Sequence, residues 1–169
     1  MVKHILVPLD GSEYAEKALD FAQTLALATK AHISLLTVIM RFGAVLPNQR
    51  QLEASSHAHI TEYLHPIRDM LARNGLDVSA HVDFGNPADA IADFARQESV
   101  DLIVMATHGV GSRSTYALGS VALKVLQIAP CPVTMKRVVE PASRHRVTSQ
   151  ERLGSSLSTV SASAPETSP

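Results

Sequence analysis

Short apolar runs alternate along the chain with longer amphipathic stretches, from the first residues to about residue 137. The runs predict five β-strands, and most of their positions are apolar in succession instead of at every second residue. Uninterrupted apolar strands are typical of a parallel sheet that is covered on both faces. The expected strands span residues 3–9, 32–39, 76–84, 101–106 and 131–137.

The stretches between these runs predict four helices, and the first two carry apolar residues at intervals of three and four. These residues are Ala15, Ala18, Leu19, Ala22, Leu25 and Ala26 in the first helix, and Ile60, Leu64, Ile67 and Leu71 in the second. A loop over residues 41–52 is expected before the second helix. Pro66 should kink or divide that helix, and Asn74-Gly75 should end it with a left-handed residue.

The third helix should start after Asn86, whose side chain can cap it, with Pro87 in its first turn. The fourth is expected over residues 119–129. Strands that alternate with helices predict an α/β fold, with a mainly parallel five-stranded sheet and helices on both faces. In such folds, ligands bind at the carboxyl ends of the strands, where the strand order reverses. The segments after the first and fourth strands should therefore hold the chemistry.

Together, the two segments have the composition of a site for a phosphate-bearing ligand. Their glycines can bring backbone N–H groups close to a ligand, and a helix that starts at Gly119-Ser120 offers unpaired N–H groups to a phosphate. Asp10 can accept hydrogen bonds from ribose hydroxyls or approach a metal ion carried by phosphates. Arg113 is the one cation between residues 106 and 120, and His108 is expected to shape the loop. A flexible Gly/Ser connection without a ligand is the alternative. The candidate binding residues are Pro8, Leu9, Asp10, Ala106, His108, Gly109, Gly111, Arg113, Gly119, Ser120 and Val121.

The composition changes near residue 140 and divides the chain. From Ala142 to Pro169, eight positions are serine and only seven of 28 are hydrophobic. Such a segment buries too little apolar surface to offset the entropy of ordering it. We therefore expect one domain over residues 1–140, followed by a disordered Ser-rich tail over residues 141–169.

Charge and length exclude several classes of protein. The formal net charge of the chain is −1, so it lacks the basic excess of a protein that binds nucleic acid non-specifically. A bound anion must instead be held by local backbone amides. The N-terminal apolar run, Ile5 to Leu9, is too short for a secretory signal or a membrane span. We expect no nucleic acid or membrane partner and a cytoplasmic location.

Other motifs with defined chemistry are absent from the sequence. It contains no GxxxxGK[ST] phosphate loop and no GxSxG nucleophile elbow, and the glycines that start at Gly109 do not complete a GxGxxG fingerprint. On a helix, His57, His59 and His65 do not converge, which favours a solvated face over a metal site. We therefore assign no catalytic and no metal-binding residue.

Three stretches resemble the universal stress protein family: HILVPLDGSEYAEKAL, GNPADAI and DLIVMATHGVGSRSTYALGSVALKVLQIAPCPVTMKR. The resemblance covers residues 2–137. It implies a parallel α/β fold of the adenine-nucleotide α-hydrolase type, with strand order 3-2-1-4-5. It also implies a dimer, since members of the family are usually dimeric. Nucleotide-binding members carry Gly, two residues, Gly, nine residues, then Gly-Ser or Gly-Thr. This chain carries Gly109, Gly119 and Ser120 at the later positions and Ala106 at the first.

The resemblance also implies roles for single residues and for the last strand. Asp10 would contact the ribose, Val38 would line the adenine pocket, and Gly109, Gly119 and Ser120 would hold phosphates. The last strand, residues 132–137, would pair with its counterpart in a homodimer.

Three functions are compatible with the sequence. The first is a stress-response module that binds ATP, ADP or AMP, with Mg²⁺ carried by the phosphates. The second is a nucleotide-free family member that acts through protein–protein contact. The third is a slow ATPase or autophosphorylating enzyme, with Ser120 or a neighbouring hydroxyl as acceptor. The glycines and Ser120 favour the first, and the lack of an evident catalytic base disfavours the third.

Overall fold

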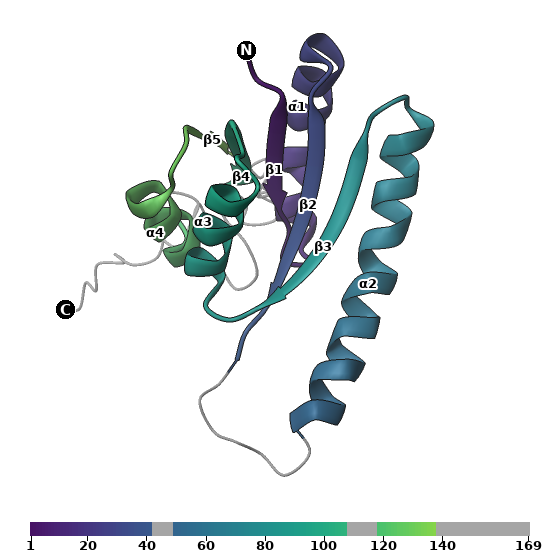
Figure 1. Ribbon diagram of the computed structural model, residues 1–169, viewed down its shortest axis with the longest axis vertical. Coiled ribbons are helices and arrows are strands. Elements are labelled where there is room, and N and C mark those ends of the chain that lie inside the picture. The colour runs from purple at the N-terminus through teal and green to yellow at the C-terminus, as the bar shows by residue number, and fades with distance from the viewer. Residues whose placement is uncertain (42–48, 108–117, 138–169) are drawn as a thin grey trace, which may run out of the picture. The chain divides into compact units, whose positions relative to one another are not determined.

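The protein is represented by a computed structural model that describes residues 1–41, 49–107 and 118–137 (Figure 1). All of these residues belong to one compact unit, residues 1–139. The expected Ser-rich tail lies outside the described residues. So do four of the predicted site residues, namely His108, Gly109, Gly111 and Arg113.

The sheet has five strands among the described residues, and every neighbouring pair is parallel. The strands are β1 (His4–Pro8), β2 (His32–Ile39), β3 (Val78–Phe84), β4 (Leu102–Ala106) and β5 (Val133–Lys136). Their order across the sheet is β3-β2-β1-β4-β5, which confirms the predicted fold class and strand order. Each strand lies within its predicted range.

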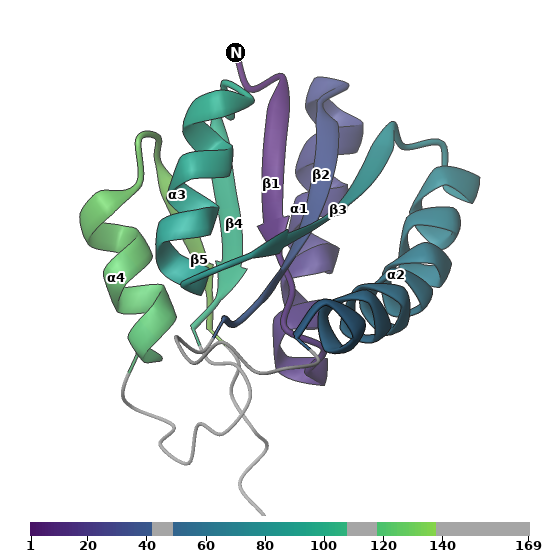
Figure 2. The same ribbon diagram turned by 60° about the horizontal axis from the view of Figure 1, so that its bottom comes forward.

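Four helices cover the two faces of this sheet. They are α1 (Glu13–Thr29), α2 (Gln49–Arg73), α3 (Pro87–Gln97) and α4 (Ser120–Ile128). Figure 2 shows α1 and α2 on one side of the sheet and α3 and α4 on the other. None of the helices in the described ranges is long and apolar enough to cross a membrane.

The alternating side chains of the central strand divide the core into two parts. Ile5 and Val7 of β1 pack with alanines of α1 and with Leu64 and Leu71 of α2. Leu6 points to the other face and packs with residues of α3 and α4. Ile5, Leu6 and Val7 are fully buried, and each such side chain stabilises the fold by about 1.5–3 kcal/mol. The uninterrupted apolar run therefore supplies side chains to both parts of the core.

Helices α1 and α3 each start at a side-chain cap, and the cap at Asn86 confirms the one that the sequence predicts. The Ser12 hydroxyl accepts a hydrogen bond of 3.1 Å from the backbone N–H of Ala15. The Asn86 side chain accepts one of 3.2 Å from the backbone N–H of Ala88. Both bonds satisfy N–H groups that have no partner within the helix. They fix where the chain turns from strand to helix at the carboxyl edge of the sheet.

Helix α2 differs from its prediction at one end. The expected loop over residues 41–52 is wrong for residues 49–52, because α2 already begins at Gln49. Residues 49–59 hold few apolar side chains, so their periodicity is weak, but Gln, Leu, Glu and Ala favour helix and neither Gly nor Pro interrupts them. Pro66 does not divide the helix, although the ribbon of α2 bends along its course in Figure 2. The predicted left-handed end is confirmed at Gly75, whose φ is +82°.

Candidate functional site

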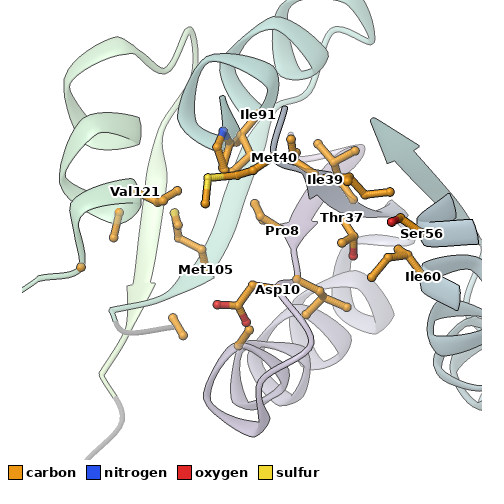
Figure 3. A pocket seen from close by; sticks show the side chains of 18 of the residues that line it. Pro8, Asp10, Thr37, Ile39, Met40, Ser56, Ile60, Ile91, Met105 and Val121 are labelled. Carbon is orange, nitrogen blue, oxygen red and sulfur yellow. The ribbon is translucent and has the colours of Figure 1, made fainter. Parts of the chain in front are cut away.

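A cavity of about 580 Å³ opens at the carboxyl ends of β1, β2 and β4 (Figure 3). This volume is within the usual range for sites that bind small molecules. Its walls come from three strand ends and from all four helices. They comprise Pro8, Leu9, Asp10, Ala15, Leu36, Thr37, Val38, Ile39, Met40, Ser56, His59, Ile60, Pro87, Ile91, Met105, Ala106, Gly119, Val121 and Ala122.

The topology of the sheet explains why a cavity forms here. Strand β1 lies between β2 and β4, and the helices that follow β1 and β4 pack on opposite faces. The two connections therefore diverge at the carboxyl edge and leave a crevice between them, as is general at the switch point of an open parallel sheet. Described residues of the two segments that the sequence predicts to hold the chemistry, such as Asp10 and Gly119, line this crevice.

Asp10 stands at the end of β1 in a tight turn. Its Oδ1 accepts hydrogen bonds from the backbone N–H of Ser12, at 3.1 Å, and from the Ser12 hydroxyl, at 2.6 Å. Gly11 between them has a φ of +82°, which glycine adopts without the steric cost of a side chain. Because Ser12 also caps α1, the Asp10 carboxylate is fixed to the start of that helix. It lines the cavity in a defined position.

The N-terminus of α4 forms another wall. The backbone N–H of Gly119 donates to the carbonyl oxygen of Thr107 at 2.9 Å, which holds the start of α4 against the end of β4. Gly119 is the cap residue and has no side chain with which to satisfy the N–H groups of the first turn, and this turn contains no acidic residue. These N–H groups and the positive end of the helix dipole suit an anionic group in the cavity.

The backbone position of Gly119 leaves room for a small side chain. A β-carbon added there would meet only the carbonyl oxygen of Thr107, at 3.6 Å, which is an ordinary van der Waals contact. The fold therefore accepts alanine at this position. A longer side chain would compete for space with an occupant of the cavity.

The structure brings seven of the predicted site residues together around one cavity. They are Pro8, Leu9, Asp10, Val38, Ala106, Gly119 and Val121. Ser120 is the first residue of α4 and is exposed, next to two lining residues but not itself part of the wall. The role of each residue toward a ligand stays a prediction.

Several lining residues were missed by sequence reasoning, above all Thr37 of β2 and Ser56, His59 and Ile60 of α2. Thr37 precedes Val38 directly, so its position at a strand end was a usable signal. Ser56 and His59 carried no such signal, because this half of the helix has the pattern of a polar, solvated face. Ile60 belongs to the apolar stripe of the helix, which predicts a core position and not a cavity wall. Only the packing of α2 beside β2 and β3 brings these residues to the cavity.

Thr37 is notable because its hydroxyl has no hydrogen-bond partner among the described residues. The residue is 4% exposed. Within the part of the chain that the structure describes, its Oγ1 is the one buried side-chain polar atom without a hydrogen bond. Burying a hydroxyl in this way costs about 1–3 kcal/mol. An unsatisfied hydroxyl in a cavity wall is what a site for a polar ligand provides.

A hydrogen bond between helices holds the α2 wall in place. The hydroxyl of Tyr63 on α2 donates to Glu16 of α1 at 2.9 Å. Burial raises the pKa of Tyr63 well above its usual range, and the bond to Glu16 and the negative charges of Glu16 and Asp10 raise it further. The phenol therefore stays protonated and keeps donating. Tyr63 follows Ile60 by about one turn, so the bond fixes the wall close to the cavity.

The chemistry of the cavity is that of a binding pocket. Among the described lining residues, four polar side chains, from Asp10, Thr37, Ser56 and His59, are set among apolar ones. Nowhere in the described ranges do three or more His, Cys, Asp or Glu side chains gather in a way that could hold a metal ion. The pocket suits a ligand with a flat, weakly polar part and an anionic end.

The fold and this site together define a class of protein, namely parallel α/β proteins with a ligand crevice at the switch point of a five-stranded sheet. Within that class, the model of the universal stress protein family matches residues 1–137. The chain therefore belongs to the universal stress protein family.

Individual relatives agree with this assignment. Universal stress protein YxiE of Bacillus subtilis is 30% identical over 148 residues, which cover 81% of this chain and all of YxiE. The solved structure of the protein MJ0577 aligns with a TM-score of 0.77 at 28% identity and covers 83% of this chain and 99% of that one. Universal stress protein UspA from Lactobacillus plantarum gives a TM-score of 0.73 at 27% identity and covers 80% and 98%.

A further solved structure is that of a universal stress protein in complex with cAMP. It aligns with a TM-score of 0.63 at 23% identity and covers 80% of this chain and 97% of that one. At this identity, the likeness is one of fold.

Proposed function

We propose that this universal stress protein binds an adenine nucleotide, ATP or its products ADP and AMP, between the segments after β1 and β4. One observation carries the proposal. Described residues of the two segments that the sequence marks as a nucleotide site border a single cavity of about 580 Å³, which ends at the N-terminus of α4. A cavity of this size can enclose most of a nucleotide.

The walls suit the parts of a nucleotide. The first-turn N–H groups of α4 would donate hydrogen bonds to phosphate oxygens. The fixed carboxylate of Asp10 would accept hydrogen bonds from ribose hydroxyls. The apolar side chains of Val38 and Ile39 offer flat surface to the base. Mg²⁺ would enter with the phosphates. A universal stress protein of the same fold has been solved in complex with cAMP, which is an adenine nucleotide. In that protein, this architecture accommodates such a ligand.

The decisive experiment is calorimetry on purified protein from which nucleotide has been stripped. We expect MgATP to bind with a dissociation constant in the micromolar range or weaker, about −8 kcal/mol at 1 µM. If millimolar MgATP gives no heat, the proposed nucleotide binding is wrong. If ATP binds and is converted slowly to ADP or to a phosphoprotein, the enzymatic alternative is correct.

The assignment of the phosphate end has its own test at Gly119. The variant Gly119→Leu should abolish MgATP binding and remain folded, whereas Gly119→Ala is the matched control, because its β-carbon meets only an ordinary contact. Circular dichroism would report the fold of both variants. If Gly119→Leu keeps its affinity, the phosphates bind elsewhere.

We also propose that two copies pair through β5. This strand forms one edge of the sheet, and an uncovered edge with free backbone groups invites pairing. Helix α4, which precedes β5, exposes Leu123 by 49% and Leu126 by 43%. Exposed apolar side chains of this size are typical of a surface that a second copy covers.

A further inference from the structure

The unsatisfied hydroxyl of Thr37 needs an explanation that the fold does not supply. Oγ1 lies in a residue that is 4% exposed and bonds to no described group. Valine has nearly the same shape and would fill this place without the cost of a buried, unpaired hydroxyl. The hydroxyl therefore destabilises the protein without a ligand. A ligand that hydrogen-bonds to it would offset this free-energy cost.

The position of Thr37 shows where such a partner would lie. Thr37 lines the cavity and, by strand alternation, shares a face of β2 with Ile33 and Leu35, which belong to the core under α1 and α2. In Figure 3, Thr37 lies beside Ser56 and Ile60 of α2. This group marks one end of the cavity, which we call the α2 end.

The α2 end is separated from the anion-binding end of the same cavity. Val121 stands at the start of α4, which packs on the opposite face of the sheet from α2. Figure 3 shows Val121 and Met105 on one side of the cavity and Ser56 and Ile60 on the other, with Pro8 between them. A ligand whose phosphates bind at α4 must therefore extend across the carboxyl edge of β1 to reach Thr37.

The surroundings of Thr37 restrict the ligand group that fits there. A hydroxyl can both donate and accept one hydrogen bond, whereas Ile39 and Ile60 next to it offer only apolar contact. An anionic group would lose its hydration there and would be repelled by the negative charges of Glu16 and Asp10, which act on nearby Tyr63. A neutral nitrogen heterocycle has apolar faces and an edge of donors and acceptors, so it meets both conditions.

We infer that the Thr37 hydroxyl hydrogen-bonds the edge of the nucleotide base and determines how tightly the base is held. This inference rests on the proposed function and adds a specificity-determining residue to it. The base occupies the α2 end, and Thr37 gains in the complex the hydrogen bond that it lacks in the empty protein. Removing the hydroxyl then has opposite effects on the empty and the occupied protein.

The test compares wild type with Thr37→Val, which removes the hydroxyl at constant shape, and with Thr37→Ser, which keeps it. We expect Thr37→Val to weaken MgATP binding about tenfold in calorimetry, the loss of one buried hydrogen bond of about 1.4 kcal/mol. Thr37→Ser should keep most of the affinity. Inorganic triphosphate, which has no base, should bind wild type and Thr37→Val equally.

Urea unfolding without nucleotide separates this role from a structural one. We expect Thr37→Val to unfold at the same urea concentration as wild type or a higher one, because an unpaired hydroxyl is removed. A lower midpoint together with unchanged MgATP affinity would assign the hydroxyl to the fold and overturn the inference. If wild type binds MgATP and Thr37→Val binds it equally well, this inference alone fails. If wild type binds no nucleotide, the proposed function fails with it.

Discussion

At the scale of single residues, three histidines on the face of the sheet under α3 hydrogen-bond to serine hydroxyls. The Ser79 hydroxyl lies 2.8 Å from Nε2 of His32, 2.8 Å from Nε2 of His81 and 3.1 Å from the Ser34 hydroxyl. Ser34 in turn lies 2.8 Å from Nε2 of His4. The ring of His81 also packs against Phe94 of α3, with the ring centroids 4.9 Å apart. The residues form a polar network across β1, β2 and β3.

This network makes stability depend on pH through His81. Burial lowers the pKa of His81, Glu98 opposes this shift, and His32 and His4 add to it. An unfolded histidine has a pKa of about 6.5, so the unfolded chain takes up this proton first as the pH falls. The contribution of neutral His81 to stability is therefore present above pH 6.5 and is lost as the pH falls through its lower, folded-state pKa.

The variant His81→Phe tests this dependence. We expect the free energy of unfolding of wild type to fall more steeply between pH 7 and pH 5 than that of His81→Phe, as measured by urea unfolding at each pH. His81→Phe removes this titrating group, so the difference between the two curves reports His81 together with its interactions with Glu98, His32 and His4. Parallel curves would contradict the prediction.

At the scale of elements, α2 combines two halves with different stabilisation. Its C-terminal half packs Leu64 and Leu71 into the core, and both side chains are almost fully buried. Its N-terminal half supplies cavity residues such as Ser56. The hydrogen bond from Tyr63 to Glu16 lies where the two halves meet. The order of the cavity wall therefore depends on a link between α2 and α1.

Breaking that link should lower stability by a modest amount. Tyr63→Phe removes the hydroxyl that donates to Glu16, and we expect a loss of about 1 kcal/mol in the free energy of unfolding. Urea unfolding with an unchanged slope would measure it. Glu16→Gln keeps an acceptor opposite Tyr63 and should cost less. Equal stability of Tyr63→Phe and wild type would show that water replaces the bond fully.

At the scale of the whole molecule, every second residue of β5 presents its backbone N–H and C=O groups to the open edge of the sheet. Ile103 and Thr107 donate backbone hydrogen bonds to the carbonyl oxygens of Pro132 and Lys136. Residues of a parallel strand alternate in the neighbour they face, so the backbone groups of Val133 and Met135 face the open edge. Those two residues would pair with a second copy.

Proline at this edge should therefore prevent dimerisation. Met135→Pro removes an N–H group that makes no bond within the sheet, so the fold should persist. Met135→Ala is the matched control, because it shortens the same side chain and keeps the N–H group. In sedimentation equilibrium at tens of micromolar, we expect wild type and Met135→Ala at twice the 18.1 kDa chain mass and Met135→Pro at that mass. A monomeric wild type would rule out the dimer.

Much of this architecture can be read from the sequence because it depends on short-range patterns. Apolar runs such as Ile5 to Leu9 predict strands, and caps such as Asn86 predict where helices start. Both signals reflect the conformation of a few consecutive residues. The first half of α2 lacked them, because its polar residues form helix by propensity and not by an apolar stripe.

The sequence by itself determined the alternation of strands and helices, the class of fold and the two segments that border the site. The strand order followed from family resemblance, since local periodicity does not say which strands are neighbours. Tertiary structure alone decided that α2 forms a wall of the cavity and that Thr37 is buried without a hydrogen-bond partner in the described part of the chain. The reason is that burial and the lack of a partner depend on groups far apart in the chain, which become neighbours only when the sheet and its helices have packed.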